Sequence, residues 1–200
     1  MKIPTLEEAK KLIDEAGSMN PGLWVEHSRV TAHCAERIAG GCEGMDREAA
    51  YILGLLHDVG RRFGESHFGH VVFGYRYMKN LGYEDVARIC LTHSFQHQNI
   101  NAYIGKFDVP EEEKRDAERL LLSITYDDYD RLIQLCDGLA MAEGVALMEK
   151  RLIDVVMRYG FNEYTTLKWK AIFDLKTYFE NKTGRNIYEL ITDDRSLWGK

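Results

Sequence analysis

The sequence lacks the features that would place this chain in a membrane or in an oxidising compartment. No apolar run approaches the roughly 18 residues that a membrane span requires. The N-terminus, Met1-Lys2-Ile3-Pro4 followed by a charged segment, does not resemble a signal peptide. The four cysteines show no C-x-x-C spacing, so we expect reduced thiols and no zinc site built from them. These absences predict a cytoplasmic protein.

Excess basic charge and strand patterns are also missing. The net charge of -6 argues against a general nucleic-acid-binding protein, and we expect neither nucleic acid nor a membrane as a partner. No period-2 alternation, internal repeat or low-complexity segment occurs. What is present is a chain of 200 residues, 45% of them hydrophobic, with apolar residues at helical spacing. The sequence predicts an all-α fold in which residues 1–200 form one helical domain.

Capping residues, glycines and prolines divide the chain into successive predicted helices. Thr5-Leu6-Glu7-Glu8 has the form of a capping box, Asp46 is suited to an N-cap, and Pro110 opens an acidic first turn. The predicted helices cover about residues 6–16, 23–39, 46–58, 67–80, 84–92, 110–124, 131–143, 147–159 and 164–181. We expect the aspartates of residues 127–130 to cap the seventh helix, and a short helical piece at most after residue 184.

The segment from Ala49 to Gly60 is almost wholly apolar until it reaches His57 and Asp58. We expect a helix here, with Gly60 just past its C-terminus. A carboxylate in the last turn of a helix lies at the negative end of the helix dipole. Burial adds a desolvation cost of several kcal/mol. A cation beside Asp58 would remove both penalties, and His57 offers a second ligand, so the pair suggests a metal site.

Three further polar residues share the apolar faces of their predicted helices. His27, His93 and Asp137 lie three or four residues from apolar side chains, whereas His33 lies among charged residues and is expected on the surface. Histidine and carboxylate without cysteine suit iron, manganese, zinc or nickel. The alternative is structural, with the two buried aspartates paired to arginines. The arginines available are Arg61, Arg131 and Arg158.

Three short motifs occur in a fixed order on successive predicted helices. They are His27-Ser28-Arg29-Val30, Leu55-Leu56-His57-Asp58-Val59-Gly60 and Leu135-Cys136-Asp137-Gly138-Leu139-Ala140. This ordered set, over roughly residues 23 to 145, resembles the HD superfamily of metal-dependent phosphohydrolases. The resemblance implies a helical fold with a site between helices and hydrolysis of a phosphoester or phosphoanhydride. It assigns His27, His57, Asp58 and Asp137 to one metal ion.

Two further histidines extend the pattern. His70 lies in His70-Val71-Val72-Phe73-Gly74, and His93 lies in Leu91-Thr92-His93-Ser94. The resulting order is similar to that of the dinuclear branch that contains bis(5'-nucleosyl)-tetraphosphatases. This likeness implies that Asp58 bridges two ions and that His70 and His93 hold the second. The Gly-Tyr-Pro motif of the cyclic-dinucleotide branch is absent, which disfavours that substrate.

Three residues near the motifs depart from the family pattern. Arg61 stands where the family often has lysine, and its guanidinium group can contact phosphate in a bidentate way. His67 is an extra histidine that could replace His70 as a ligand; we favour it as the acid that protonates the leaving group. His97 is a second extra histidine, expected on the surface or behind the ligands.

Together these features predict a metal-dependent phosphohydrolase acting on a small phosphorylated molecule, with a nucleotide as first choice. The predicted catalytic residues are Asp58, Arg61 and His67. The cofactor would be one or two divalent ions, iron or manganese first, with magnesium, zinc, nickel and cobalt as alternatives. Two other functions stay open: an HD-type diiron oxygenase, and a non-catalytic module that binds metal or nucleotide. Whether the chain forms a homodimer is also open.

Overall fold

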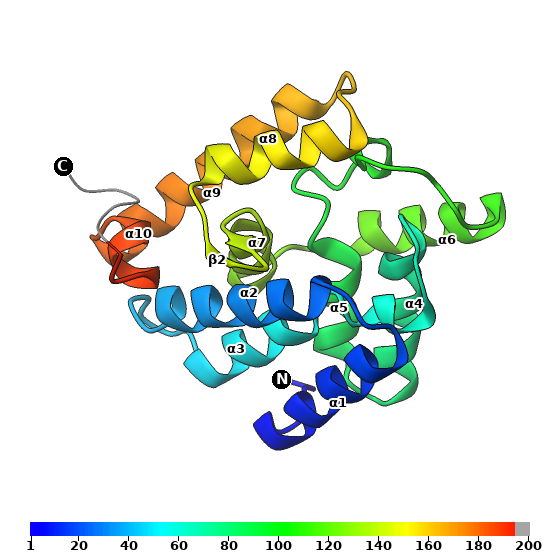
Figure 1. Cartoon of the computed structure of the whole chain (residues 1–200), viewed down its shortest axis with the longest axis horizontal. Helices are drawn as coiled ribbons and strands as arrows, with labels where there is room; N and C mark the ends of the chain where they lie inside the picture. Colours follow the sequence, from blue (N-terminus) through cyan, green and yellow to red (C-terminus); the bar gives the residue numbers. More distant parts are fainter. Residues whose placement is uncertain (195–200) are drawn as a thin grey trace.

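The computed structural model describes residues 1–194, which fold into helices and one small hairpin (Figure 1). The elements are α1 (Leu6–Met19), α2 (Trp24–Ala39), α3 (Arg47–Leu56), the 3-10 helix η1 (Val59–Phe63), α4 (Gly69–Asn80), α5 (Glu84–Thr92), the 3-10 helix η2 (Ile100–Ala102), α6 (Glu111–Ser123), α7 (Asp128–Asp137), β1 (Ala140–Met141), β2 (Gly144–Val145), α8 (Met148–Tyr159), α9 (Thr165–Thr183) and α10 (Ile187–Ile191). The predicted all-α class is confirmed.

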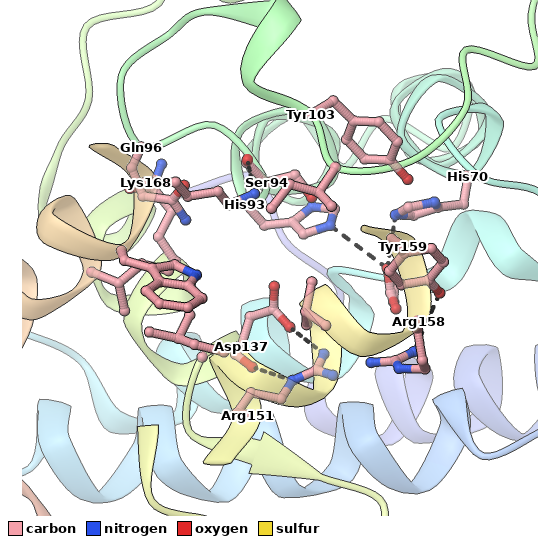
Figure 2. A pocket seen from close by; sticks show the side chains of 18 of the residues that line it. His70, His93, Ser94, Gln96, Tyr103, Asp137, Arg151, Arg158, Tyr159 and Lys168 are labelled. Carbon is pink, nitrogen blue, oxygen red and sulfur yellow. Dashed lines mark hydrogen bonds and ion pairs between the residues drawn. The ribbon is translucent and has the colours of Figure 1, made fainter. Parts of the chain in front are cut away.

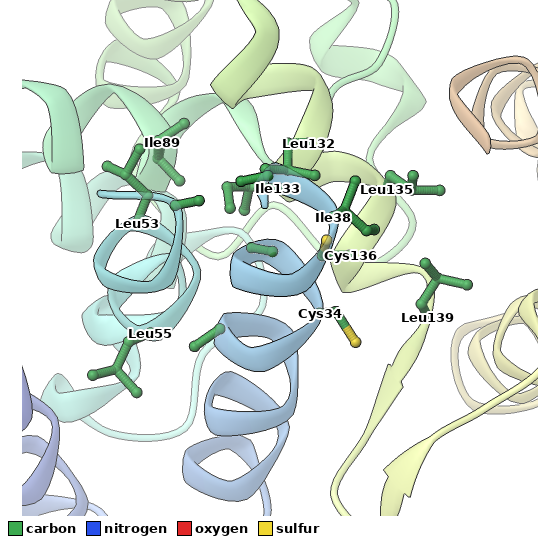
Figure 3. Packing of buried hydrophobic residues seen from close by; sticks show 14 of the residues in the cluster. Cys34, Ile38, Leu53, Leu55, Ile89, Leu132, Ile133, Leu135, Cys136 and Leu139 are labelled. Atoms are coloured by element: carbon green, nitrogen blue, oxygen red, sulfur yellow. The ribbon is translucent and has the colours of Figure 1, made fainter. Parts of the chain in front are cut away.

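The main core lies where α2, α3, α5 and α7 meet (Figure 3). It contains fully buried side chains from each helix, among them Ile38, Leu53, Ile89 and Leu135. A Cβ atom added to Gly54 would lie 2.8 Å from the Cα atom of Ala32, so α2 and α3 approach backbone to backbone. This close approach brings the C-terminal end of α3 beside α2.

Helix α3 ends at Leu56, two residues before the end that the sequence predicts, and η1 follows. Asp58 therefore lies between the two helices, as the N-cap residue of η1. Gly60 does not serve as a left-handed helix cap, because its φ is not among the positive ones. A Cβ atom there would lie 2.0 Å from the carbonyl oxygen of His70, so Gly60 allows η1 to contact α4. That contact sets the separation of Asp58 from His70.

Helix α7 ends at Asp137, not near residue 143 as predicted. Gly138 caps it, and the chain then forms the antiparallel β1–β2 hairpin, with Ala140 paired to Val145. Gly144, at φ 135°, gives the turn a conformation that L residues rarely adopt. At the other end of α7, Asp127 caps the helix as expected, through bonds from the amides of Tyr129 and Asp130.

The helices after the hairpin lie on the α7 side of the body (Figure 1). Met148 and Leu152 of α8, and Ile172 and Phe179 of α9, join the main core. A second apolar cluster, centred on Phe68, holds α4, α5 and α6 together. All four cysteines are buried and form no disulfide. No helix within residues 1–194 combines the length and the apolar character needed to cross a membrane.

Candidate metal centre

The six predicted ligand residues come together where six segments meet. His27 lies on α2, His57 at the end of α3, and Asp58 at the start of η1. The remaining three come from the first turn of α4 and from the ends of α5 and α7, and are His70, His93 and Asp137. Five of the six are buried, and the side chain of Asp137 keeps 26% of its surface exposed. The histidine rings are neighbours: the centroid of His57 lies 5.3 Å from that of His27 and 5.0 Å from that of His93.

In each of the four histidines among the predicted ligands, the Nδ1 atom faces a backbone carbonyl oxygen. The distances are 3.2 Å from His27 to Ala140, 2.7 Å from His57 to Gly54 and 2.9 Å from His93 to Cys90. His70 makes the equivalent bond to the carbonyl of His67. A carbonyl oxygen only accepts hydrogen bonds, so each Nδ1 carries the proton and donates it. In the neutral rings the lone pair is therefore on Nε2, as in metal-binding histidines.

These Nε2 atoms point at carboxylate oxygens. His27 Nε2 lies 3.1 Å from Oδ1 of Asp137. His70 Nε2 and His93 Nε2 lie 3.1 Å and 3.6 Å from Oδ1 of Asp58, and His57 Nε2 lies 4.0 Å from Oδ2. A lone pair facing a carboxylate at such distances is repulsive, unless a cation, either a proton or a metal ion, lies between them. The arrangement therefore needs positive charge at several points at once.

Protons are poor candidates for all of that charge. Burial, together with the neighbouring His57, lowers the pKa of His93 to about 3. Burial also lowers the pKa of His57, although Asp58 opposes the change. Both rings are thus neutral near pH 7. Among the described residues, His57 Nε2, Asp58 Oδ1 and His70 Nε2 are buried atoms without a hydrogen bond. Buried polar atoms are rarely left unsatisfied in native proteins, so the donor set fits a metal ion.

Arginines also contact both aspartates, so the structural alternative holds in part. Arg61 Nε donates to Oδ2 of Asp58 at 2.6 Å. Although burial raises the pKa of the Asp58 carboxyl, the charge of Arg61 holds it well below its usual range. Asp137 is paired with Arg151, at 3.4 Å, and not with Arg131 or Arg158. Arginine pairing uses one oxygen of Asp58 and leaves Oδ1 directed at histidines.

The donor atoms form two overlapping sets that share one residue. Nitrogen and oxygen atoms of His27, His57 and Asp58 lie within 4.8 Å of one another, and so do those of Asp58, His70 and His93. Asp137 adjoins the first set through His27. Asp58 therefore stands where a carboxylate can contact two ions, which is the position that the sequence resemblance implies for it.

A family model for the HD domain matches residues 24–142 of this chain. The chain belongs to the HD domain family. All six predicted ligand residues fall inside the matched segment, whereas α8, α9 and α10 follow it. No curated protein and no solved structure matches the chain.

The HD-domain donor set lies at the wall of a cavity that the C-terminal helices complete (Figure 2). Asp58, Arg61, His70, His93 and Asp137 line it from the matched segment. Further lining residues that sequence reasoning missed are Tyr103, Arg151, Arg158, Tyr159, Lys168 and Trp169. Their only sequence signal is a repeat on α8, where two arginines seven residues apart fall on one helix face.

The other histidines lie outside the donor sets. The prediction that a helix begins at His67 is wrong: α4 begins at Gly69, and His67 precedes it. The carbonyl oxygen of His67 accepts a hydrogen bond from His70, and the His67 ring lies 5.8 Å from that of Tyr159. His67 lines a neighbouring cleft that also reaches Arg61. His97 is exposed, with Nε2 3.2 Å from the carbonyl of Leu167, and His33 is exposed on α2. The predicted surface position of His33 is confirmed.

Proposed function

We propose that this HD-domain protein is a metal-dependent phosphohydrolase that acts on a small phosphorylated molecule, with nucleotides as the first class to test. One observation carries the proposal: buried histidine nitrogens and a carboxylate oxygen without hydrogen bonds lie beside a cavity rimmed by arginines. The first feature favours a metal ion, and the second favours an anionic ligand next to it.

The residues in the two donor sets divide the binding of metal between them. His27, His57, Asp58 and Asp137 would hold one divalent ion, and Asp58, His70 and His93 the second. Iron and manganese are our first choices for this set of nitrogen and oxygen donors. When bound, such ions act as Lewis acids toward a phosphoryl oxygen and make water nucleophilic at neutral pH.

Arg61 and Tyr103 supply what a phosphoryl group needs next to these donors. Both side chains line the cavity with Asp58. Burial lowers the pKa of Arg61, but the adjacent Asp58 raises it more, so the guanidinium stays charged and can balance negative charge developing on phosphorus. Burial raises the pKa of Tyr103, which keeps its hydroxyl protonated as a hydrogen-bond donor. His67, in the adjoining cleft, is the candidate that protonates the leaving oxygen.

The deciding experiment measures metal content and phosphate release on the same preparation. Protein purified without oxygen or chelator is analysed for metals and then assayed with nucleotides and sugar phosphates. We expect one or two ions per chain and metal-dependent phosphate release. Asp58→Asn should abolish release and reduce metal content, whereas His33→Ala, on the exposed face of α2, should change neither. Equal loss in both folded variants, or oxygen consumption without phosphate release, would contradict the proposal.

A further inference from the structure

We propose that Lys168, assisted by Arg151, forms a second anion-binding subsite, so that the substrate carries another anionic group besides the phosphate that is cleaved. The proposal rests on the proposed function in one respect: the metal centre receives the first phosphate. It adds a recognition element from α8 and α9, which follow the segment that the family model matches. The chemical class is a small bis-anionic phosphate compound, either a bisphosphate or a phosphorylated carboxylic acid.

Lys168 is a lysine in the cavity wall without a carboxylate partner. Its Nζ atom donates to the carbonyl oxygen of Ser94 at 2.9 Å, and no ion pair within 4.0 Å is formed among the described residues. Two other lysines of α9 form ion pairs: Lys176 with Glu180 at 2.6 Å, and Lys182 with Asp128. An ammonium group has three donors, so Lys168 retains the capacity to bind an anion.

Lys168 lies at the end of the cavity opposite His70. In Figure 2 it lies with Gln96 and Ser94, across the cavity from His70 and Tyr159. Arg151, on α8, lies on the Asp137 side between these two regions. A ligand whose phosphate is held near His70 would extend along the cavity toward Lys168. A second anionic group is what an unpaired ammonium at that end would bind.

The charge balance of the cavity points the same way. Its lining includes four cationic side chains, Arg61, Arg151, Arg158 and Lys168, and two carboxylates, Asp58 and Asp137. Asp154 neutralises Arg158, at 2.7 Å, which leaves three cations against two carboxylates. Each divalent ion adds two positive charges. A single phosphate dianion would leave the loaded cavity positive, whereas a bis-anionic ligand comes closer to neutrality.

The pKa of Lys168 is lowered because its ammonium group is buried without a bound carboxylate. Burial, with the nearby charge of Arg151, lowers the pKa of Lys168 to about 8, even though Asp137 opposes the change. A desolvated ammonium group is costly unless it is paired, and an anion bound beside it would remove that cost. The bond to Ser94 offers an alternative role, since Ser94 follows His93: Lys168 could tie α9 to a ligand-bearing segment without touching substrate. The two roles predict different binding data.

The test uses the full chain loaded with Mn²⁺ and three probes that cannot be hydrolysed. Propane-1,3-bisphosphonate carries two phosphonates, 3-phosphonopropionate carries one phosphonate and one carboxylate, and propylphosphonate carries one phosphonate only. Dissociation constants are measured by titration calorimetry for the wild type, Lys168→Met and Lys168→Arg. The matched control is Lys170→Met, an exposed lysine two residues along α9. Thermal melts establish that each variant is folded.

We expect the wild type to bind at least one bis-anionic probe about ten- to a hundred-fold more tightly than propylphosphonate, which is the range for a hydrogen bond to a charged group. The better of the two identifies the second group as phosphate or carboxylate. Lys168→Met should remove the preference and leave propylphosphonate binding unchanged, Lys168→Arg should retain most of it, and Lys170→Met all of it.

Three results would overturn the inference. One is a wild type that binds all three probes equally; metal-dependent phosphate release would then leave the proposed function standing. A second is a Lys168→Met variant that weakens all probes alike, which is the signature of a tether acting on His93. The third is a wild type that binds none of the probes with metal bound.

Discussion

Replacing Gly60 with alanine should disrupt the metal centre, although Gly60 is not itself a predicted ligand. A Cβ atom at residue 60 would lie 2.0 Å from the carbonyl oxygen of His70, 2.5 Å from the amide nitrogen of Gly74 and 2.9 Å from its Cα. Real Cβ atoms do not approach other heavy atoms within 3.0 Å, so η1 and α4 must separate by about 1 Å. All three contacts are backbone atoms of one helix, and no side-chain rotation relieves them.

That separation exceeds what a metal site tolerates. Asp58 lies two residues before Gly60, and His70 Nε2 is 3.1 Å from its Oδ1 atom. Metal–ligand distances are held to within about 0.2 Å, so a shift of about 1 Å should cost at least tenfold in metal affinity. Overpacking should also destabilise the metal-free protein by about 1–3 kcal/mol, a fall in Tm of about 2–12 °C for a chain of this size.

Gly54→Ala is the matched control, because Gly54, in α3, is also a glycine packed against the backbone of a neighbouring helix. Its added Cβ would lie 2.8 Å from the Cα of Ala32, so the backbones of α2 and α3 must also move apart, but by less than those of η1 and α4. Alanine also gains about 1 kcal/mol of helix propensity over glycine in a helix interior. Mn²⁺ binding is measured by equilibrium dialysis and stability by thermal melts. If Gly60→Ala binds Mn²⁺ and melts like Gly54→Ala, the steric reasoning is wrong.

Four further predictions concern residues in and around the site. Asp130→Ala should cost several kcal/mol in chemical denaturation, because buried Asp130 binds both the half-buried Arg88 and the buried Thr92. Asp116→Ala, at a side chain that is 46% exposed, should cost little, and equal small losses would contradict this. His67→Ala should lower kcat without changing metal content, since the backbone carbonyl that accepts the hydrogen bond from His70 remains. Tyr103→Phe should raise KM more than it lowers kcat. If His67→Ala instead raised KM and Tyr103→Phe lowered kcat, Tyr103 would be the proton donor and His67 the substrate-binding group. The metal-free protein should lose stability as pH falls from 7.5 to 5, because unfolded His93 takes up a proton below pH about 6.5 while the folded residue, with a pKa of about 3, stays neutral. This residue contributes about 2 kcal/mol of that loss at pH 5, so His93→Gln should melt with a weaker pH dependence.

The residues of the donor set stand out in the sequence because each places a polar or charged side chain at a position that its apolar neighbours predict to be buried. Asp58 and His57 interrupt an apolar helix, and His93 and Asp137 occupy core-facing positions of theirs. Polar groups at such positions need partners, and the order of the motifs then supplies the family. What the sequence does not encode locally is the common orientation of the histidine rings. That orientation comes from carbonyl oxygens at helix ends and, for His27, from the hairpin at Ala140, which the sequence pattern assigned to a helix.

The substrate-facing half of the cavity was not predictable for a different reason. Arg151 and Lys168 occupy amphipathic helices whose polar positions resemble any solvated face, and nothing in the sequence distinguishes Lys168 from the exposed Lys170. They become part of the site only because α8 and α9 return to α7, which buries Leu152 and Ile172 in the core and turns these cations toward Asp137. The candidate metal ligands therefore lie in the segment that the family model matches, while the cations of α8 and α9 that would discriminate between substrates follow it. Proteins with this metal centre and different C-terminal helices should therefore differ in the anion they select.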